Sequence, residues 1–275
     1  FAALLAKCFG KKTYFTGGID SLDSDYASAF NYKIQALFFK LCYWVADSCI
    51  IVSQSDLKNI FKVSSLKKKL SYSEHVINTK LFIADVPKEK IFTSIVWMGD
   101  EGNVVRKGVD KALQIFAELK KIPEVVDYRF VIIGRKGEGE VLVRSIIDKY
   151  NLKGSVELKG EVSEEDKINL LKQSKYYFQL SLYEGFGLAA LEALCANNII
   201  IHSGKGGLAN PIYKEQLLFD IDNDFDSELL KLVNKLACFT PITSYDNLLE
   251  YYDIQRRKDD FEAIIVNGKS NYKLK

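Results

Sequence analysis

The feature that most constrains the fold is a repeated alternation of short β-forming runs with longer segments of helical period. After residue 90 the chain contains the runs IFTSIVWMG, YRFVIIG, SVELKG, YYFQLSL and IIIHS, and segments whose apolar residues recur at helical spacing lie between them. Runs this apolar are typical of strands buried on both faces, and intervening helices are the connections that parallel strands require. The pattern predicts an α/β fold with parallel sheets that helices cover on both sides.

The first part of the chain repeats this alternation on a smaller scale. KTYFTG is followed by a predicted helix from Tyr32 to Ala46, by the apolar run SCIIVS, and by a short helix with Ser53 or Ser55 as its N-cap. A polar passage from Leu66 to Lys90 then separates this part from the longer alternation. We interpret the passage as the boundary between two α/β units.

Composition narrows the classes of protein that this chain can be. Its 275 residues, of which 48% are hydrophobic, suffice for one large or two ordinary globular domains. There are 38 lysine and arginine residues against 36 aspartate and glutamate, a formal net charge of +2, so the overall charge gives no reason to expect a nucleic-acid partner. Any anion-binding site must therefore be local.

The cysteines and the apolar segments bear on location. Five cysteines without a C-x-x-C pair, and only two histidines, favour a reducing compartment and no metal site. The longest apolar stretch, from Ala36 to Val52, is interrupted by Lys40 and Asp47, so no transmembrane span is predicted. We expect a cytoplasmic protein.

Two features of the first residues leave alternatives open. Aromatic residues widen the apolar face of the helix from Tyr32 to Ala46, which favours contact with a preceding segment, with peripheral contact at the inner face of a membrane as the alternative. The chain also begins at Phe1 within an apolar pattern. We therefore expect it to be the later part of a longer protein.

The stretch YEGFGLAALEAL carries the strongest chemical signal. Gly185 and Gly187 form a turn between a predicted strand and a helix that begins near Leu188, and the free N–H groups at such a helix start can bind an anion. Glu184 precedes the turn and Glu192 lies on the following helix, so the two carboxylates can address two ends of one bound molecule. Spacing alone leaves a simpler interpretation equally open, in which Glu184 is a surface residue and Glu192 is half of an ordinary ion pair on a helix surface.

Further motifs accompany this stretch along nearly the whole chain. They are HVINTKLF, VRKGVDKALQIFAEL, RFVIIGRKGEG, VELKGEVSEEDKINLLKQSKYYFQLS and IIIHSGKGG. With EGFGLxxLEAL they resemble the retaining glycosyltransferases of family 4, which have the GT-B fold of two Rossmann-like domains with parallel sheets. The resemblance implies the C-terminal part of an incomplete acceptor-side domain at residues 1–84, the donor-binding domain at 85–247, and a helix that crosses back to the first domain at 248–275.

The resemblance also implies roles for the matching residues. Glu184 would hold hydroxyl groups of the donor sugar, Glu192 the ribose hydroxyls of the nucleotide, and Lys107 the diphosphate, with Glu184 and Lys107 as the expected catalytic residues. The expected donor-binding residues are Arg106, Lys107, Gly134, Gly160, Val162, Glu184, Gly185, Phe186, Gly187, Leu188 and Glu192, and the acceptor-side residues are Gly18 and Asp20. A lysine and a helix N-terminus can stabilise a departing diphosphate without a metal, so we expect neither a metal nor a cofactor.

Two positions depart from the family pattern. Asp100 stands after the first donor-domain strand where the family usually has arginine, and a longer loop precedes Lys107, so Arg106 would have to supply the missing charge. Without that charge, phosphate binding would be weaker. Gly17 stands where many members have histidine, which weakens the prediction for the acceptor-side residues.

The resulting hypothesis is a glycosyltransferase that moves a sugar from a nucleotide diphosphate donor to a hydroxyl of a glycan or lipid-linked acceptor. The anomeric configuration would be retained, and surface polysaccharide assembly is the expected setting. Two alternatives remain, a non-catalytic GT-B homologue that binds a partner and an epimerase of nucleotide sugars. Asp100 supports the first, whereas the second lacks a suitable base at the sugar.

Overall fold

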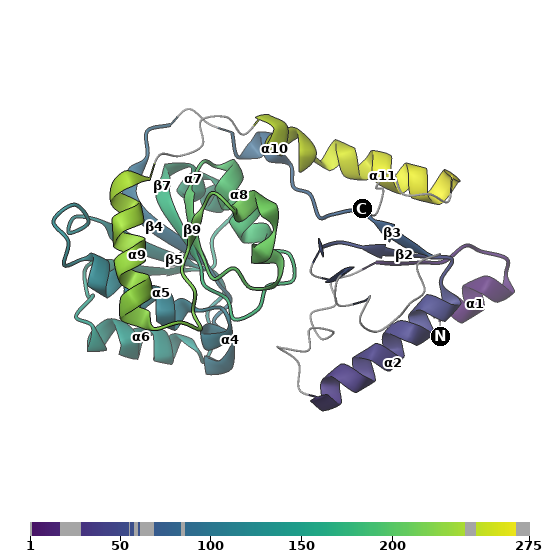
Figure 1. Cartoon of the computed structure of the whole chain (residues 1–275), viewed down its shortest axis with the longest axis horizontal. Coiled ribbons are helices and arrows are strands. Elements are labelled where there is room, and N and C mark those ends of the chain that lie inside the picture. Colours follow the sequence, from purple (N-terminus) through teal and green to yellow (C-terminus); the bar gives the residue numbers. More distant parts are fainter. Residues whose placement is uncertain are drawn as a thin grey trace. The chain divides into compact units, whose positions relative to one another are not determined.

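The computed structural model describes residues 2–16, 29–54, 56–57, 60, 69–83, 86–239 and 246–267. It divides the chain into two compact units, the first comprising residues 1–77, 184–186 and 250–275 and the second residues 78–183 and 187–249. Figure 1 labels their helices and strands. Each unit contains its own parallel sheet, so the α/β fold predicted from the sequence is confirmed.

Among the described residues, the sheet of the second unit has six parallel strands in the order β6-β5-β4-β7-β8-β9. They are β4 (Glu89–Ile95), β5 (Arg129–Ile133), β6 (Val156–Gly160), β7 (Ser174–Gln179), β8 (Ile199–His202) and β9 (Leu217–Leu218). The chain adds β5 and β6 on one side of β4 and then β8 and β9 on the far side of β7. The strand order therefore reverses between β4 and β7, the position at which doubly wound sheets bind ligands.

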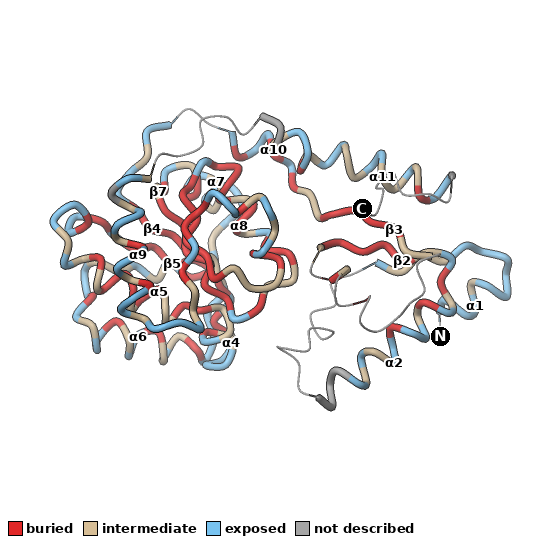
Figure 2. Tube along the Cα trace, viewed as in Figure 1, coloured by how far each residue is buried: buried red, intermediate tan, exposed pale blue. Residues whose placement is uncertain are grey.

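Helices cover both faces of this sheet. They are α4 (Glu101–Arg106), α5 (Val109–Leu119), α6 (Glu140–Lys149), α7 (Glu164–Gln173), α8 (Leu188–Cys195) and α9 (Phe225–Cys238), with short 3-10 turns at Thr79–Leu81, Gly206–Ala209 and Pro211–Tyr213. Alternate residues of β5 enter opposite cores: Phe130 and Ile132 pack with Phe116 of α5, and Val131 and Ile133 pack with Leu170 of α7. Figure 2 shows the central strands β4, β5 and β7 buried along most of their length.

As far as its residues are described, the first unit has a smaller sheet of three parallel strands in the order β1-β2-β3. Its elements are α1 (Ala2–Cys8), β1 (Tyr14–Thr16), α2 (Ala29–Val45), β2 (Ser48–Ile51), β3 (Leu70–Tyr72), α10 (Asp246–Tyr251, whose first residues belong to the second unit) and α11 (Ile254–Asn267). Phe39 and Tyr43 of α2 pack on Cys49 and Ile51 of β2. The Ser53 hydroxyl accepts the backbone N–H of Asp56 at 3.1 Å, as expected of an N-cap.

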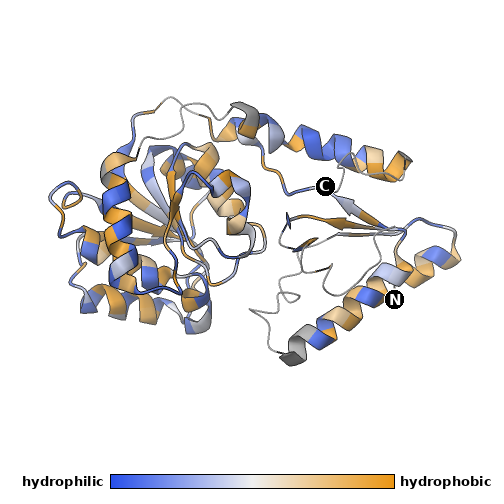
Figure 3. Ribbon diagram, viewed as in Figure 1, coloured by the Kyte–Doolittle hydropathy of each residue, from blue (hydrophilic) through white to orange (hydrophobic). Residues whose placement is uncertain are grey.

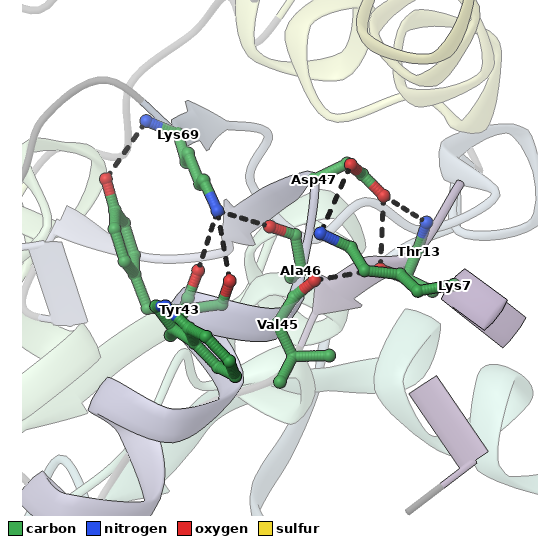
Figure 4. Close-up of polar contacts among 8 residues, drawn as sticks. Lys7, Thr13, Tyr43, Val45, Ala46, Asp47 and Lys69 are labelled. Carbon is green, nitrogen blue, oxygen red and sulfur yellow. Dashed lines mark hydrogen bonds and ion pairs between the residues drawn. The ribbon is translucent and has the colours of Figure 1, made fainter. Parts of the chain in front are cut away.

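One side of α2 remains uncovered within the described residues. Leu37, Phe38, Leu41 and Trp44 are exposed, and Figure 3 shows the apolar character along this helix. The C-terminal end of α2 is closed by Lys69, whose ammonium donates hydrogen bonds to the carbonyls of Tyr43, Trp44 and Ala46 (Figure 4). None of the helices in the described part of the chain is both long and apolar enough to cross a bilayer.

The structure corrects one expectation and adds one strand that the sequence pattern did not show. The segment before Lys107, expected as a loop, forms the helix α4, because the Asp100 carboxylate accepts the backbone N–H of Asn103 at 2.6 Å and caps its first turn. The polar passage from Leu66 to Lys90 contains the strand β3, whose three residues are too few to show a period in the sequence.

Candidate functional site

The ends of β4 and β7 meet at the point where the strand order reverses. The backbone N–H of Leu182, after β7, donates to the carbonyl of Arg106 at 2.8 Å. Gly108 lies so close to this segment that a Cβ atom would stand 2.0 Å from the carbonyl oxygen of Leu180. Only glycine fits there, and its φ of 70° is also left-handed. The start of α5 is therefore fixed against the segment that follows β7.

Two helices near these strand ends, α5 and α8, begin in the same way. Gly108 precedes α5 and Gly187 precedes α8, both are left-handed with φ of 70° and 87°, and neither helix start has a side-chain cap. By contrast, α4, α7 and α9 are capped by Asp100, Ser163 and Asp224, while α6 also lacks a side-chain cap but begins after a right-handed glycine, Gly139. The first N–H groups of α5 and α8 are consequently not used by a capping side chain and suit an anion.

Lys107 and Arg106 bring positive charge to the start of α5. Lys107 is half-buried and directly precedes Gly108. The Arg106 guanidinium donates from Nη2 to Oδ1 of Asn103 at 2.5 Å, so it lies along its own helix. Asp100, which stands where the resemblance implies arginine, is engaged as the cap of that helix. Whether Arg106 supplies the missing charge to a phosphate stays a prediction.

Two predicted glycines join the neighbouring strand ends. Gly134, after β5, donates its N–H to the carbonyl of Gly160 at 2.8 Å, and a Cβ on Gly134 would stand 2.0 Å from the carbonyl oxygen of Val96. Val162 then packs partly against the core formed by Ile133 and its neighbours. These residues form a continuous edge from β4 to β6, beside the start of α7.

Glu192 forms an ion pair that the sequence did not reveal. The Lys167 ammonium lies 2.9 Å from each carboxylate oxygen of Glu192 and 2.7 Å from Glu164. Burial raises the pKa of Glu192, while Lys167 acts in the opposite direction. Because Lys167 comes from α7 and Glu192 from α8, no local spacing connects them. The interpretation of Glu192 as a helix-surface pair is right about pairing, although its partner comes from another helix.

The residues Glu184, Gly185 and Phe186 belong to the first unit. The Phe186 ring is buried and lies edge-on to the ring of His75, at a centroid distance of 5.4 Å, and 6.2 Å from that of Tyr252. Arg257 donates a hydrogen bond to Nδ1 of His75 at 2.7 Å. Burial is the main cause that lowers the pKa of His75 to about 4, and the positive charge of Arg257 adds to it. Phe186 thus anchors its loop, and Glu184 beside it is half-buried.

The other predicted residues differ in what the structure says of them. Leu188 is the exposed first residue of α8. Gly18 and Asp20 lie outside the described residues. Within the described ranges, no three histidine, cysteine, aspartate or glutamate side chains are grouped so that they could hold a metal ion. His202, at the end of β8, is buried with its ring 5.6 Å from that of Tyr213.

Comparison with known proteins adds to this geometry. Residues 102–237 match the family model described as glycosyl transferases group 1. This segment is a glycosyl transferases group 1 domain. It contains Arg106, Lys107 and the whole run from Gly134 to Glu192.

The relatives of the glycosyltransferase domain include two curated proteins. GDP-mannose:cellobiosyl-diphosphopolyprenol alpha-mannosyltransferase of Xanthomonas oryzae is 32% identical over an aligned stretch of 163 positions, which covers 52% of this chain and 40% of the relative. One subunit of the human phosphatidylinositol N-acetylglucosaminyltransferase is 32% identical over 106 residues, or 38% of this chain and 21% of the relative. The chain therefore matches less than half the length of either.

The likeness to solved structures extends beyond the glycosyltransferase domain. Anabaena Alr3699/HepE, in complex with UDP-glucose, superposes with a TM-score of 0.76 at 12% identity, covering 97% of this chain and 75% of that one. At this identity the likeness concerns the fold alone. It assigns the GT-B fold, with two Rossmann-like parts, to the chain.

Proposed function

We propose that the chain is the donor-binding part of a retaining glycosyltransferase of family 4 that uses a nucleotide diphosphate sugar. The observation that carries the proposal is the pair of uncapped helix starts, at α5 and α8, that follow the two strands where the sheet order reverses. Lys107 stands directly before one of them. Two sets of helix-start N–H groups and a lysine at one edge fit a diphosphate.

The proposed chemistry needs charge stabilisation more than a strong base. The acceptor hydroxyl oxygen forms a bond to the anomeric carbon while the bond from that carbon to the diphosphate oxygen breaks. The leaving diphosphate takes the acceptor proton, and attack on the same face retains the anomeric configuration. Lys107 and the helix N–H groups stabilise the negative charge on the leaving group, so that no metal is required.

The remaining predicted residues would orient the donor. Glu184 would accept hydrogen bonds from the donor sugar and Glu192 from the ribose, while the edge formed by Gly160 and Val162 would lie against the base. A carboxylate accepts hydrogen bonds only, which suits hydroxyl donors. The names of the relatives, which specify GDP-mannose with a diphosphopolyprenol-linked glycan and N-acetylglucosaminyl transfer to phosphatidylinositol, support a donor of this class and a glycan or lipid-linked acceptor.

The proposal extends to setting and location. We propose a role in surface polysaccharide assembly in the cytoplasm, with peripheral contact at the inner face of the membrane where the acceptor is lipid-linked. The five cysteines are free thiols, which fits a reducing compartment.

Calorimetry with UDP and GDP, with and without excess chelator, tests the donor site. We expect binding in both conditions, and Lys107→Ala should weaken it by about 1.5–3 kcal/mol, the range for hydrogen bonds to charged groups. The matched control is Lys153→Ala, because Lys153 is an exposed lysine of the same unit that pairs with Asp148 on the surface. Loss of binding on chelation would overturn metal independence, and equal effects of the two variants would overturn the role of Lys107.

A second measurement separates the two carboxylates. Glu184→Gln should reduce sugar transfer far more than the affinity for free nucleotide, whereas Glu192→Ala should reduce both. Equal losses of nucleotide affinity in the two variants would contradict this division. Arg106→Ala, compared with Lys107→Ala in the same assay, measures whether Arg106 supplies the charge that Asp100 does not.

A further inference from the structure

We propose that Lys167 is a positioning residue that holds the Glu192 carboxylate charged and oriented toward the ribose diol of the bound nucleotide, an inference that rests on the ribose role proposed above for Glu192. Lys167 does not itself contact the nucleotide. It acts through the carboxylate of another helix.

The geometry of the pair supports this role. Lys167 Nζ is 2.9 Å from Oε1 and 2.9 Å from Oε2 of Glu192, so the ammonium lies between the two oxygens. Each carboxylate oxygen retains further acceptor capacity for a hydroxyl donor. The side chains of Lys167 and Glu192 are each 16% exposed, whereas Glu164, the third member, is 68% exposed. The inner pair is therefore fixed, and Glu164 is a partner at the surface.

The position of the pair in the fold points to the ligand edge. Lys167 lies in the first turns of α7, where its backbone N–H donates to the Ser163 carbonyl at 2.9 Å. Glu192 lies in the second turn of α8, the helix that starts at Gly187. Both helices start at the carboxyl ends of parallel strands, the edge at which such sheets bind nucleotides. An ion pair that joins these helix starts fixes the carboxylate where the ribose is expected.

Electrostatics explains why the carboxylate needs a cation. Burial raises the pKa of Glu192, and the negative charge of Glu164 adds to this, while Lys167 opposes both. Burial by itself lowers the pKa of Lys167, but Glu164 and Glu192 together raise it above its usual value, so the ammonium stays charged. Cys195, a further titratable neighbour of Glu192, is a neutral thiol with a pKa of about 12. Lys167 is thus the cation that opposes protonation of Glu192.

The test compares ribonucleotides with analogues that lack the diol. Calorimetry is run with UDP and GDP and with their 2′,3′-dideoxy counterparts, for the wild type, Lys167→Met, Lys167→Arg, Glu192→Gln and Glu164→Gln. We expect the wild type to bind a ribonucleotide about tenfold or more tightly than its dideoxy analogue. The analogue lacks the hydroxyl groups that would donate hydrogen bonds to the charged carboxylate. Glu192→Gln and Lys167→Met should reduce this preference to about threefold or less, and Lys167→Arg should restore most of it. Glu164→Gln, the matched control, should leave it unchanged.

A pH profile separates positioning from general damage. In Lys167→Met the pKa of Glu192 should rise further, so ribonucleotide affinity should fall on acidification at a higher pH than in the wild type. A purely structural defect would lower the affinity equally at every pH, and circular dichroism checks that each variant folds.

Three different results would each reject a different claim. Failure of the wild type to bind UDP or GDP would reject the proposed function, and this inference with it. An unchanged preference in Glu192→Gln would reject the ribose role of Glu192. Loss of the preference in Glu192→Gln but not in Lys167→Met would reject the inference about Lys167 alone.

Discussion

The two units build parallel sheets of the same kind but differ in how completely they bury them. In the second unit, helices cover both faces, and β4 and β5 have neighbouring strands on either side. In the described part of the first unit, both outer strands of the three-stranded sheet lack an outer neighbour, and α2 presents Phe38 and Trp44 to the surface. The candidate diphosphate edge thus belongs to the better-packed unit, which suits a site that depends on fixed backbone N–H groups.

The difference also bears on the glycine loop before α8. Its first residues are held in the first unit by the ring of Phe186 between His75 and Tyr252, whereas Gly187 and α8 belong to the second. Glu184 and Glu192, the two carboxylates proposed to bind the donor sugar and the ribose, therefore belong to different units. Variants that weaken one unit should separate their contributions.

The largest effect on stability is expected from removing a buried aromatic ring, that of Phe92, from the core of the second unit. Phe92 is fully buried, and its ring stacks on Tyr176 and Phe178 at centroid distances of 4.6 and 5.1 Å and meets Phe116 and Tyr128 edge-on. Phe92→Ala should lower the free energy of unfolding of this unit by about 3–5 kcal/mol, because it leaves a cavity among rings that cannot collapse. Nucleotide binding should weaken with it.

Phe39→Ala is the counterpart in the first unit. Phe39 is buried, but among the described residues its ring meets those of Phe15 and Tyr43 alone, at 6.4 and 6.3 Å. Phe39→Ala should lower the free energy of unfolding of the first unit by about 3 kcal/mol, the low end of the range given for Phe92→Ala, because a small core relaxes more easily around a cavity. Segment-resolved hydrogen exchange reports each unit separately, which matters because a chain of two units need not unfold in one step. A larger loss at Phe39 than at Phe92 would break the comparison.

The length and burial of each element also determine how much of the fold could be predicted from the sequence. Strands β4, β5, β7 and β8 of the second unit are largely apolar and long enough to show a pattern, so they were predicted, as were the more polar β6 and the turn at Gly187. The two-residue strand β9 was not predicted. The helix α4 was missed because six residues carry little periodicity, although Asp100 is a capping residue type that signals a helix start. The pairing of Lys167 with Glu192, and of Phe186 with His75, depends on tertiary packing, which no spacing rule encodes.

The next prediction uses the two histidines of the chain, because one lies in each unit. Burial lowers the pKa of both His75 and His202 to about 4. The folded state therefore prefers the neutral rings, while an unfolded histidine takes up a proton below about pH 6.5. The associated stability is fully present above about pH 6.5 and is lost as the pH falls toward 4.

The two units should lose different amounts on acidification. For His202, buried in the second unit, the loss should approach about 3 kcal/mol. For His75 it should be about 1–2 kcal/mol, since solvent reaches that ring and screens its charge. Hydrogen exchange at several pH values, for the wild type, His75→Gln and His202→Gln, measures each slope. Either variant that keeps the full pH dependence of its own unit would contradict the assignment.

The smallest effect concerns two lysines that close helix ends in the same way. Lys69 donates to three carbonyls at the end of α2, the shortest bond being 2.9 Å to Ala46. Lys88, in the second unit, donates to Leu171 and Lys172 at the end of α7 and to Ala196 at the end of α8, at 3.3, 2.8 and 2.6 Å. Each ammonium thus satisfies carbonyls that a helix leaves without partners.

Lys69→Met and Lys88→Met should each cost about 1 kcal/mol, for opposite reasons. In the first unit, water reaches the freed carbonyls at the exposed end of α2 and replaces part of what is lost. In the second, burial lowers the pKa of Lys88 to about 8, so removing its ammonium also removes the cost of burying a charge. Salt distinguishes the two lysines. In about 1 M NaCl the contribution of Lys69 to the free energy of unfolding should shrink, because solvent ions screen its charge, while the contribution of Lys88 should not. Hydrogen exchange of each unit measures this salt dependence. If salt affected Lys69→Met and Lys88→Met equally, solvent would reach Lys88 as readily as Lys69, and the two units would not differ in how they bury these lysines.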